Sequence, residues 1–179
     1  MEIPVAFETS RLLARMPHLK DIPAMVEYLS DPSISDTTLT IPYPYSESDA
    51  YHWINKSKEE WINGLAYTFV LELRSTGELI GAVGLHMISL HDRAEAGYWI
   101  AEPFWNQGYA TEALTGLLKF GFDGLKLNKV FATHMDQNPS SGRVMIKAGM
   151  KHEGNLRAHY KKGEEYVNVV QYAILKNEF

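Results

Sequence analysis

The chain has 179 residues, 45% hydrophobic and 22% charged, which are ordinary values for a globular protein, so we expect one domain over residues 1–179. It contains no cysteine, which excludes a disulfide framework, a thiolate metal site and a covalent cysteine intermediate. The net charge of −5 provides no basic footprint for nucleic acid, and no apolar run approaches the roughly 18 residues that suggest a membrane span.

The first third of the chain predicts one strand and two helices. A strand is expected over 8–15, followed by a helix over 18–30 whose apolar residues recur at helical spacing. Residues 31–48 contain three prolines and no clear period, so we expect a long ordered loop there. A second helix carries Ala50, Trp53 and Trp61 on one face and ends at Asn63-Gly64.

The rest of the chain predicts mainly strands, joined by tight turns and interrupted by two helices. The expected elements are strands over 67–73, 79–87, 93–101 and 129–136, helices over 108–123 and 138–149, and two strands within 150–175. Asn138-Pro139 is a typical helix start, because Asn caps the end and Pro fits the first helical position. This order predicts a mixed sheet covered by helices, which is an α/β (α+β) fold.

The segment 96–113 combines a strand, a sharp turn and the start of a helix. A helix start presents unpaired N–H groups and a partial positive charge, so it binds anions. Gly108 lets the backbone approach a ligand without a Cβ in the way. Amides from about Asn106 to Thr111 would therefore cradle a pyrophosphate. With one glycine and no Gly-Lys-Ser/Thr, the turn is neither a Walker A loop nor a dinucleotide fingerprint, and a glycine placed only for packing is the alternative.

Four blocks in order resemble the GCN5-related N-acetyltransferases (GNAT), and among them the Rim group of ribosomal-protein N-terminal acetyltransferases. Tyr98-Trp99-Ile100 followed by 105–113 resembles the acetyl-CoA-binding motif of that superfamily. The other three blocks are 8–12, then 138–141 with 144–150, then 153–157 with Gly163, Asn168 and Tyr172. Asn106-Gln107 departs from the usual Gly-Lys or Gly-Arg, so a cation near the phosphates is lost and backbone amides are expected to bind them.

The resemblance implies a GNAT fold: a mostly antiparallel sheet of about seven strands, splayed between the fourth and fifth strands and flanked by about four helices. It implies direct transfer of an acetyl group from acetyl-CoA to a primary amine, without a metal. The pantetheine arm of the carrier would pair with the fourth strand like an added strand. The implied carrier-binding residues are Trp99, Ile100, Ala101, Asn106, Gln107, Gly108, Tyr109, Ala110, Thr111, Asn138 and Ser141.

Catalysis needs a group that deprotonates the amine and a donor for the departing thiolate. By resemblance, Ser141 would lie near the thioester sulfur as the acid; its alternative role is that of a surface hydroxyl. The candidate bases are Glu95, His134 and Glu153, with Asp136 and His86 as further options, although a lone strand His or Glu is more often structural. A backbone N–H near Trp99 would stabilise the oxyanion.

The acceptor stays open at this stage. The Rim resemblance implies the α-amine of a protein N-terminus, while related chains also acetylate a small amine such as a polyamine, amino sugar, amino acid or antibiotic. A non-catalytic module that binds acyl-CoA is a third option. The aromatic residues of 41–45, with Tyr51 and Trp53, either wall the acceptor site or fill the core. The acidic N-terminus lacks a signal-peptide pattern, which favours a cytoplasmic protein, and the resemblance makes a homodimer an option.

Overall fold

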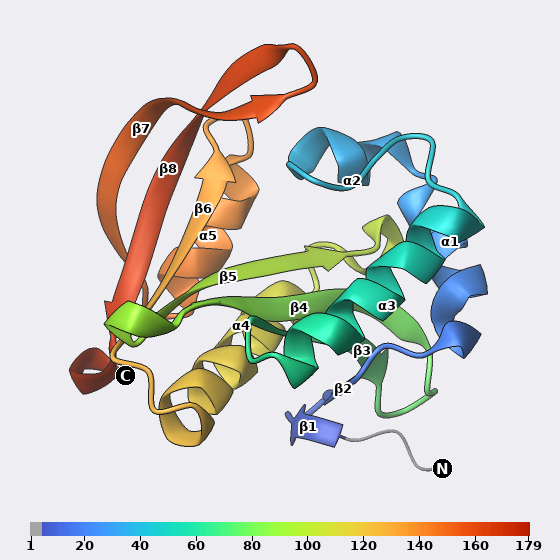
Figure 1. The fold of residues 1–179 in the computed structure, drawn as a ribbon, viewed down its shortest axis with the longest axis horizontal. Helices are drawn as coiled ribbons and strands as arrows, with labels where there is room; N and C mark the ends of the chain where they lie inside the picture. The colour runs from blue at the N-terminus through green and yellow to red at the C-terminus, as the bar shows by residue number, and fades with distance from the viewer. Residues whose placement is uncertain (1–4) are drawn as a thin grey trace.

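A computed structural model describes residues 5–179, whose strands form a single mixed sheet (Figure 1). The strand order is β1-β2-β3-β4-β5-β6-β8-β7, and only β5 and β6 pair in parallel. The strands are β1 Val5–Glu8, β2 Leu12–Arg15, β3 Ala66–Leu73, β4 Leu79–Ile88, β5 Arg93–Ile100, β6 Lys129–Met135, β7 Lys151–Lys162 and β8 Glu165–Leu175. The predicted mixed α/β sheet is confirmed, with eight strands in the described residues where about seven were expected.

The additional strand comes from the segment predicted as one strand over 8–15. There the chain turns at residues 9–11, where the Thr9 amide donates to the Leu12 carbonyl at 2.9 Å. Two short antiparallel strands, β1 and β2, result. Residues 1–4 of the predicted single domain lie outside the described part, and the extent of that domain stays a prediction.

β5 and β6 separate soon after they begin, as Figure 1 shows. They pair only where Arg93–Glu95 meets Lys129–Phe131. Beyond that point β5 stays paired with β4 as far as Ile100, while β6 follows β8 as far as Met135. Because each strand keeps its outer partner, the two inner edges diverge. The predicted splay is therefore confirmed, and it leaves backbone groups of β5 without a strand partner.

Five α-helices flank the sheet in residues 5–179. They are α1 Ile22–Leu29, α2 Pro32–Thr37, α3 Glu47–Ile62, α4 Tyr109–Lys119 and α5 Pro139–Lys147. The loop predicted over 31–48 is wrong in part, because α2 lies inside it. Asp31 caps α2 by accepting from the Ser33 amide at 2.8 Å, and Pro32 occupies the first helical position. The helix predicted over 18–30 divides into a 3₁₀ turn, Leu19–Asp21, and α1.

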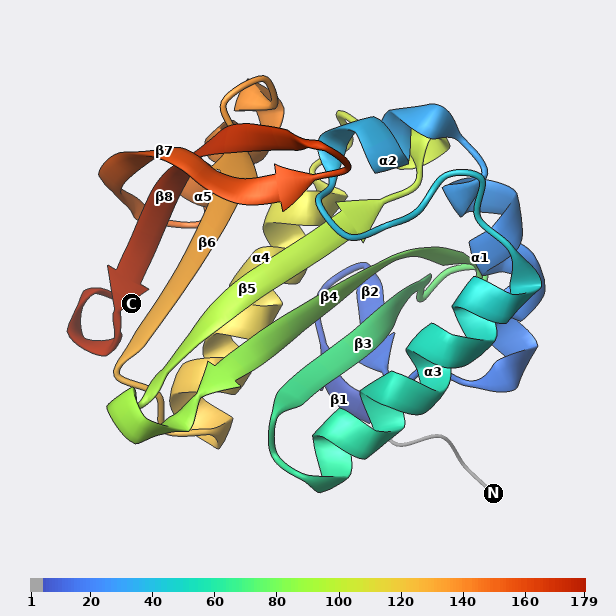
Figure 2. The ribbon, with the colours of Figure 1, turned by 45° about the horizontal axis from the view of Figure 1, so that its top comes forward.

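Two hydrophobic clusters fill the space between the sheet and the helices on its two faces. Figure 2 shows α4 on one face of the sheet and α1 and α3 on the other. On one face α4 buries Leu114 and Leu117 fully, each of which contributes roughly 1.5–3 kcal/mol relative to exposure. On the other face α1 and α3 bury Leu29 and Ile54. None of the helices described is long and apolar enough to cross a membrane. The rigid sheet between these layers fixes the position of the β5–β6 divergence.

Candidate active site

One large cleft, of about 1040 Å³, follows the divergence of β5 and β6. Its lining comes from both inner strands, from α2 and the loop after it, from the start of α4 and from α5. The predicted residues Glu95, His134 and Ser141 all line this cleft, as do Gly108 and Asn138. The sequence motifs are therefore brought together in space at one site.

The backbone of β5 offers its free groups at two positions. The Ala101 amide donates to the Ile80 carbonyl at 2.8 Å, so Ala101 forms a hydrogen-bonded pair with the β4 side. Such pairs alternate along antiparallel strands, which directs the backbone of Trp99 to β4 as well. Tyr98 and Ile100 consequently direct their backbone groups into the gap. Of Trp99, Ile100 and Ala101, Ile100 directs its backbone into the gap, as its neighbour Tyr98 does, and the role of all three as carrier contacts stays a prediction.

The Ile100 carbonyl already accepts a hydrogen bond from the Trp105 indole at 2.6 Å. The free backbone groups of this edge are thus the N–H and C=O of Tyr98 and the N–H of Ile100. They match the donors and acceptors of an extended chain that adds to a sheet edge, which is the pairing expected of a pantetheine arm.

The turn before α4 is built from two residues with left-handed backbone. Asn106 has φ 60° and Gly108 has φ 83°, and no side chain caps the helix. The first helical hydrogen bond of α4 runs from the Glu112 amide to the Gly108 carbonyl, so the amides of residues 109–111 have no acceptor within the helix. The Gln107 side chain turns back to the Pro103 carbonyl at 3.0 Å. The amides, rather than the Gln107 side chain, are therefore available to an anion.

A cation does lie beside this turn, contrary to the sequence expectation. The Arg11 guanidinium donates to the Gln107 carbonyl at 3.0 Å and stacks on the Tyr109 ring, 4.3 Å from its centroid. Its Nε also pairs with Glu112 Oε2 at 2.6 Å. Burial alone would raise the pKa of Glu112, but hydrogen bonds from Thr9, Arg11 and Ser10 outweigh burial and lower the pKa. The opening block of the sequence thus docks onto the start of α4.

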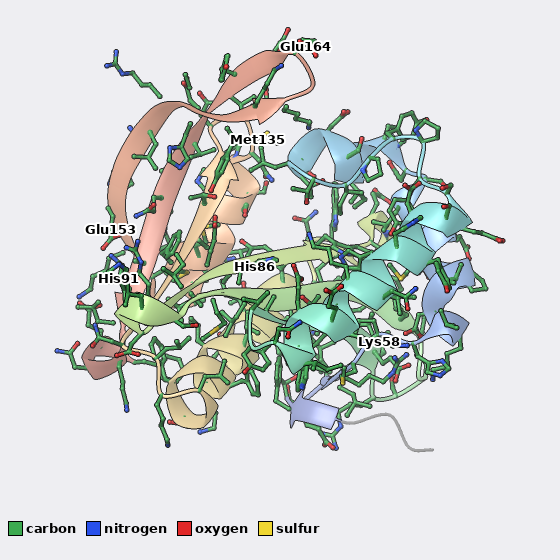
Figure 3. All side chains as sticks on the ribbon, viewed as in Figure 1. Lys58, His86, His91, Met135, Glu153 and Glu164 are labelled. Atoms are coloured by element: carbon green, nitrogen blue, oxygen red, sulfur yellow. The ribbon has the colours of Figure 1, made fainter. Side chains whose placement is uncertain are left out.

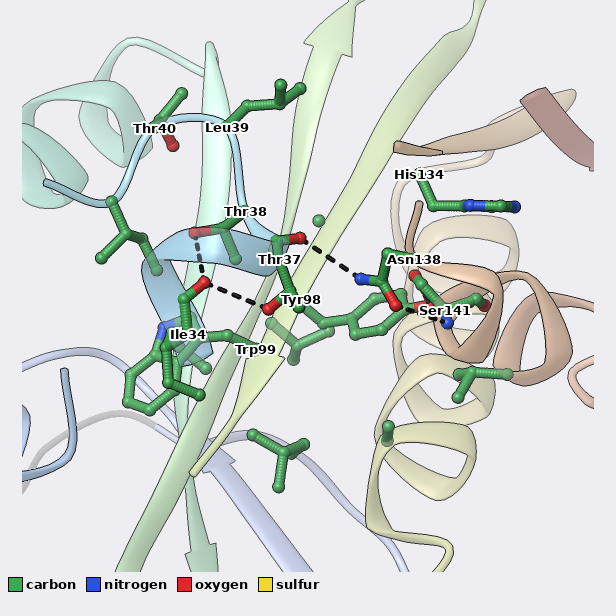
Figure 4. Close-up of a pocket in the computed structure, with 18 of the residues that line it drawn as sticks. Ile34, Thr37, Thr38, Leu39, Thr40, Tyr98, Trp99, His134, Asn138 and Ser141 are labelled. Atoms are coloured by element: carbon green, nitrogen blue, oxygen red, sulfur yellow. Dashed lines mark hydrogen bonds between the residues drawn. The ribbon is translucent and has the colours of Figure 1, made fainter. Parts of the chain in front are cut away.

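Ser141 and Asn138 lie at the start of α5, across the gap from α2 (Figure 4). The Asn138 side chain accepts from the Ser141 amide at 3.3 Å, as an N-cap does, and its Nδ2 donates to the Thr37 carbonyl at 3.3 Å. The Asn138 amide therefore ties α5 to α2 in addition to the predicted cap.

The Ser141 hydroxyl has a partner that the sequence did not reveal. Its Oγ lies 2.7 Å from the Tyr98 hydroxyl, which also lies 3.1 Å from the Ser141 carbonyl. Burial raises the pKa of Tyr98 to about 12, although the hydrogen bond to Ser141 opposes the shift. Tyr98 is therefore protonated at neutral pH, and its single proton can go to the Ser141 carbonyl or to Ser141 Oγ. In the second arrangement the seryl proton is free for a group in the cleft.

The three candidate bases have different surroundings. Glu95 lies at the last position where β5 pairs with β6, and its Oε1 accepts from Thr133 at 3.0 Å and from Tyr160 at 3.3 Å. His134 is buried, with Nδ1 2.8 Å from the Met135 carbonyl and its ring stacked on Tyr172. Both residues line the cleft, and Glu95 places its carboxylate at the closed end of the gap, where β5 and β6 part.

Glu153 is not brought to the cleft. Its carboxylate pairs with Lys129 at 2.6 Å and accepts from Gln171 at 3.0 Å, which together outweigh burial and lower its pKa. Figure 3 places Glu153 near His91, whereas Met135 marks the opposite end of β6. The prediction of Glu153 as a base is not supported, because the ion pair holds it where β6 begins.

Known proteins resemble this chain over nearly its whole length. The family described as the acetyltransferase (GNAT) domain matches residues 11–151, which include β5, α4 and α5. The uncharacterized N-acetyltransferase YnaD of Bacillus subtilis is 36% identical over 173 residues, 96% of this chain and 97% of that protein. The putative ribosomal N-acetyltransferase YdaF of Bacillus subtilis is 28% identical over 153 residues, 85% of this chain and 76% of its own length. A GNAT-family acetyltransferase structure from Bacillus anthracis is 31% identical with a TM-score of 0.84, covering 99% of this chain and 100% of that one.

Proposed function

The chain belongs to the GNAT acetyltransferase family, in its Rim-like group, and from that premise we propose that it acetylates a primary amine directly at the β5–β6 cleft. It is an acetyl-CoA-dependent N-acetyltransferase, and acetyl-CoA, when bound, supplies an acetyl thioester. The observation that carries the direct transfer is the meeting of Glu95, the Tyr98–Ser141 pair and the free β5 backbone at one gap.

The protein groups fit the carrier without a metal ion. The amides of residues 109–111 are free to bind an anionic diphosphate, and a Cβ at Gly108 would project into this turn 3.5 Å from the Arg11 guanidinium, which is paired with Glu112. Arg143 and Lys147, one helical turn apart on α5, add positive charge to the lining. The residues therefore replace the cation that the motif lacks at 106–107.

Each catalytic task has a residue in this arrangement. Glu95 accepts the proton of the attacking ammonium, directly or through water, because only a neutral amine is nucleophilic. A β5 amide that faces the gap, at Tyr98 or Ile100, stabilises the negative charge that develops on the carbonyl oxygen. Ser141, itself receiving a hydrogen bond from Tyr98, donates to the departing sulfur.

A screen of amines tests this proposal through the acetyl-CoA-dependent release of free thiol. We expect turnover with at least one class of primary amine, and a Ser141→Ala variant should lower kcat more than the affinity for acetyl-CoA. Binding of CoA without turnover on any amine or N-terminal peptide would contradict catalysis and favour an acyl-CoA-binding module.

A second acceptor, the α-amine of a protein N-terminus, is supported by one observation. YdaF, which aligns with 85% of this chain, carries the name of a putative ribosomal N-acetyltransferase. A peptide with a free N-terminus therefore belongs in the screen beside small amines. The homodimer and the cytoplasmic location also stay predictions.

A further inference from the structure

One face of β5 carries a glycine that the fold does not require. Alternation places Glu95, Gly97 and Trp99 on the same face of the strand. Gly97 is exposed, has no left-handed φ, and a Cβ built on it would meet nothing within 4 Å. By contrast, a Cβ on Gly81 of the neighbouring strand would clash with the Trp99 carbonyl oxygen. Packing explains Gly81 but not Gly97, whose bare backbone forms a floor of the cleft.

A carboxylate and an aromatic ring flank this floor. Glu95 is oriented by the Thr133 and Tyr160 hydroxyls and forms no ion pair within residues 5–179. On the other side Trp99 is half-buried against the hydrophobic cluster beneath α1 and α3. A negative group next to aromatic surface binds a cation that carries an apolar body.

α2 contributes Ile34 and Thr37 to the lining of the same cleft. Lys162, at the tip of the β7–β8 hairpin, donates to the Ser35 carbonyl at 2.7 Å and to the Asp36 carbonyl at 3.0 Å. The Asn138 side chain, at the start of α5, donates to the next carbonyl, that of Thr37. Figure 2 shows the hairpin tip beside α2. Because a cation complements the C-terminal carbonyls of a helix, these contacts hold α2 across the gap as a roof.

We propose that the acceptor is a compact cationic amine with an apolar or aromatic body, seated on Gly97 between Glu95 and Trp99 beneath α2. Gly97 and Lys162 then determine specificity: the first leaves room for the amine, and the second keeps the roof closed against a long chain. The proposal rests on the acetyl transfer proposed above, since it names the amine for that same site.

The floor is tested with Gly97→Val, because β-branched residues suit strands and the added side chain projects into the cleft. The matched control is Gly154→Val on β7, where a Cβ also meets nothing within 4 Å and which does not line the cleft. Phenethylamine is the probe, in turnover and in calorimetric titration of the CoA-loaded protein. Gly97→Val should raise its KM and Kd at least about tenfold and leave the Kd for CoA unchanged. Equal KM and Kd values for phenethylamine in Gly97→Val and Gly154→Val would contradict the proposal that the amine is seated on Gly97.

The roof is tested with Lys162→Met, and Arg157→Met on the same strand removes an exposed cation as the control. The wild type should prefer phenethylamine to a free decapeptide, and Lys162→Met should shift the ratio of kcat/KM values toward the peptide about fivefold or more. The proposed role of Lys162 would be contradicted if the wild type preferred the peptide. It would also be contradicted if Lys162→Met left the ratio of the two kcat/KM values unchanged. If no amine is acetylated, the proposed acetyl transfer is wrong. The proposed binding site is still tested, because calorimetry shows whether the wild type binds phenethylamine and whether Gly97→Val loses that binding.

Discussion

Replacing Gly108 by alanine isolates the role of the turn before α4. Gly108 has φ 83°, where an L-residue costs roughly 1–2 kcal/mol. The new Cβ would lie 3.5 Å from the Arg11 guanidinium, an ordinary contact, so the backbone strain is the main cost to the fold. For a protein of this size the strain lowers Tm by about 2–8 °C.

The expected effect on the carrier exceeds the effect on the fold. Relaxation of the strained turn moves the amides of residues 109–111, and a hydrogen bond to a charged group contributes about 1.5–3 kcal/mol. Loss of one such bond raises the Kd for CoA at least about tenfold. Calorimetric titration gives this Kd, and thermal unfolding gives the Tm of the same sample.

Gly77→Ala separates strain from binding. Gly77 has φ 74°, lies between β3 and β4, and its added Cβ would meet nothing within 4 Å. The two variants should lose similar amounts of Tm, but only Gly108→Ala should bind CoA more weakly. If both variants bind CoA as the wild type does, the turn does not hold the diphosphate.

Three further predictions concern the side chains around the cleft. Tyr98→Phe removes the hydroxyl that lies 2.7 Å from Ser141 Oγ and should lower kcat about fivefold. An unchanged kcat would contradict a role of Ser141 in the departure of the thiolate. Glu95→Gln should lower kcat about 100-fold, whereas Glu153→Gln should keep the wild-type kcat. The pKa of Glu112 is lower in the folded than in the unfolded protein, so its carboxylate stabilises the fold at pH values above the unfolded pKa. This stabilisation is lost as the pH falls through the folded pKa. Glu112→Gln should therefore have a lower Tm than the wild type at pH 7, and its Tm should fall less than that of the wild type on acidification. A Tm difference that stays the same at every pH would contradict this.

Local sequence signals predicted the elements that form the cleft. The periodic face of α4, the Asn-Pro start of α5 and the alternation of β5 each depend on neighbouring residues, so they are visible along the chain. α2 was missed because six residues are too few to show a helical period. Its Asp31-Pro32 start is nevertheless the same kind of signal that identified Asn138-Pro139, and it could have revealed the helix.

The contacts that distinguish the site join distant parts of the chain. Tyr98 and Ser141 are 43 residues apart, and Arg11 and Glu112 are 101 apart. Lys162 reaches a carbonyl 127 residues away. No local pattern encodes such pairs, because they depend on how the sheet and the helices pack. The resemblance pointed to the blocks that contain Tyr98, Ser141, Arg11 and Glu112, but not to which of these residues pair with one another.

The most direct test of the central claim is a calorimetric titration of the folded wild-type protein with CoA. The β5 edge and the turn at Gly108 should give saturable heat for a single site, with the same stoichiometry for acetyl-CoA. Absence of saturation at millimolar CoA, in a sample whose thermal unfolding is cooperative, would contradict the assignment of this cleft to the carrier.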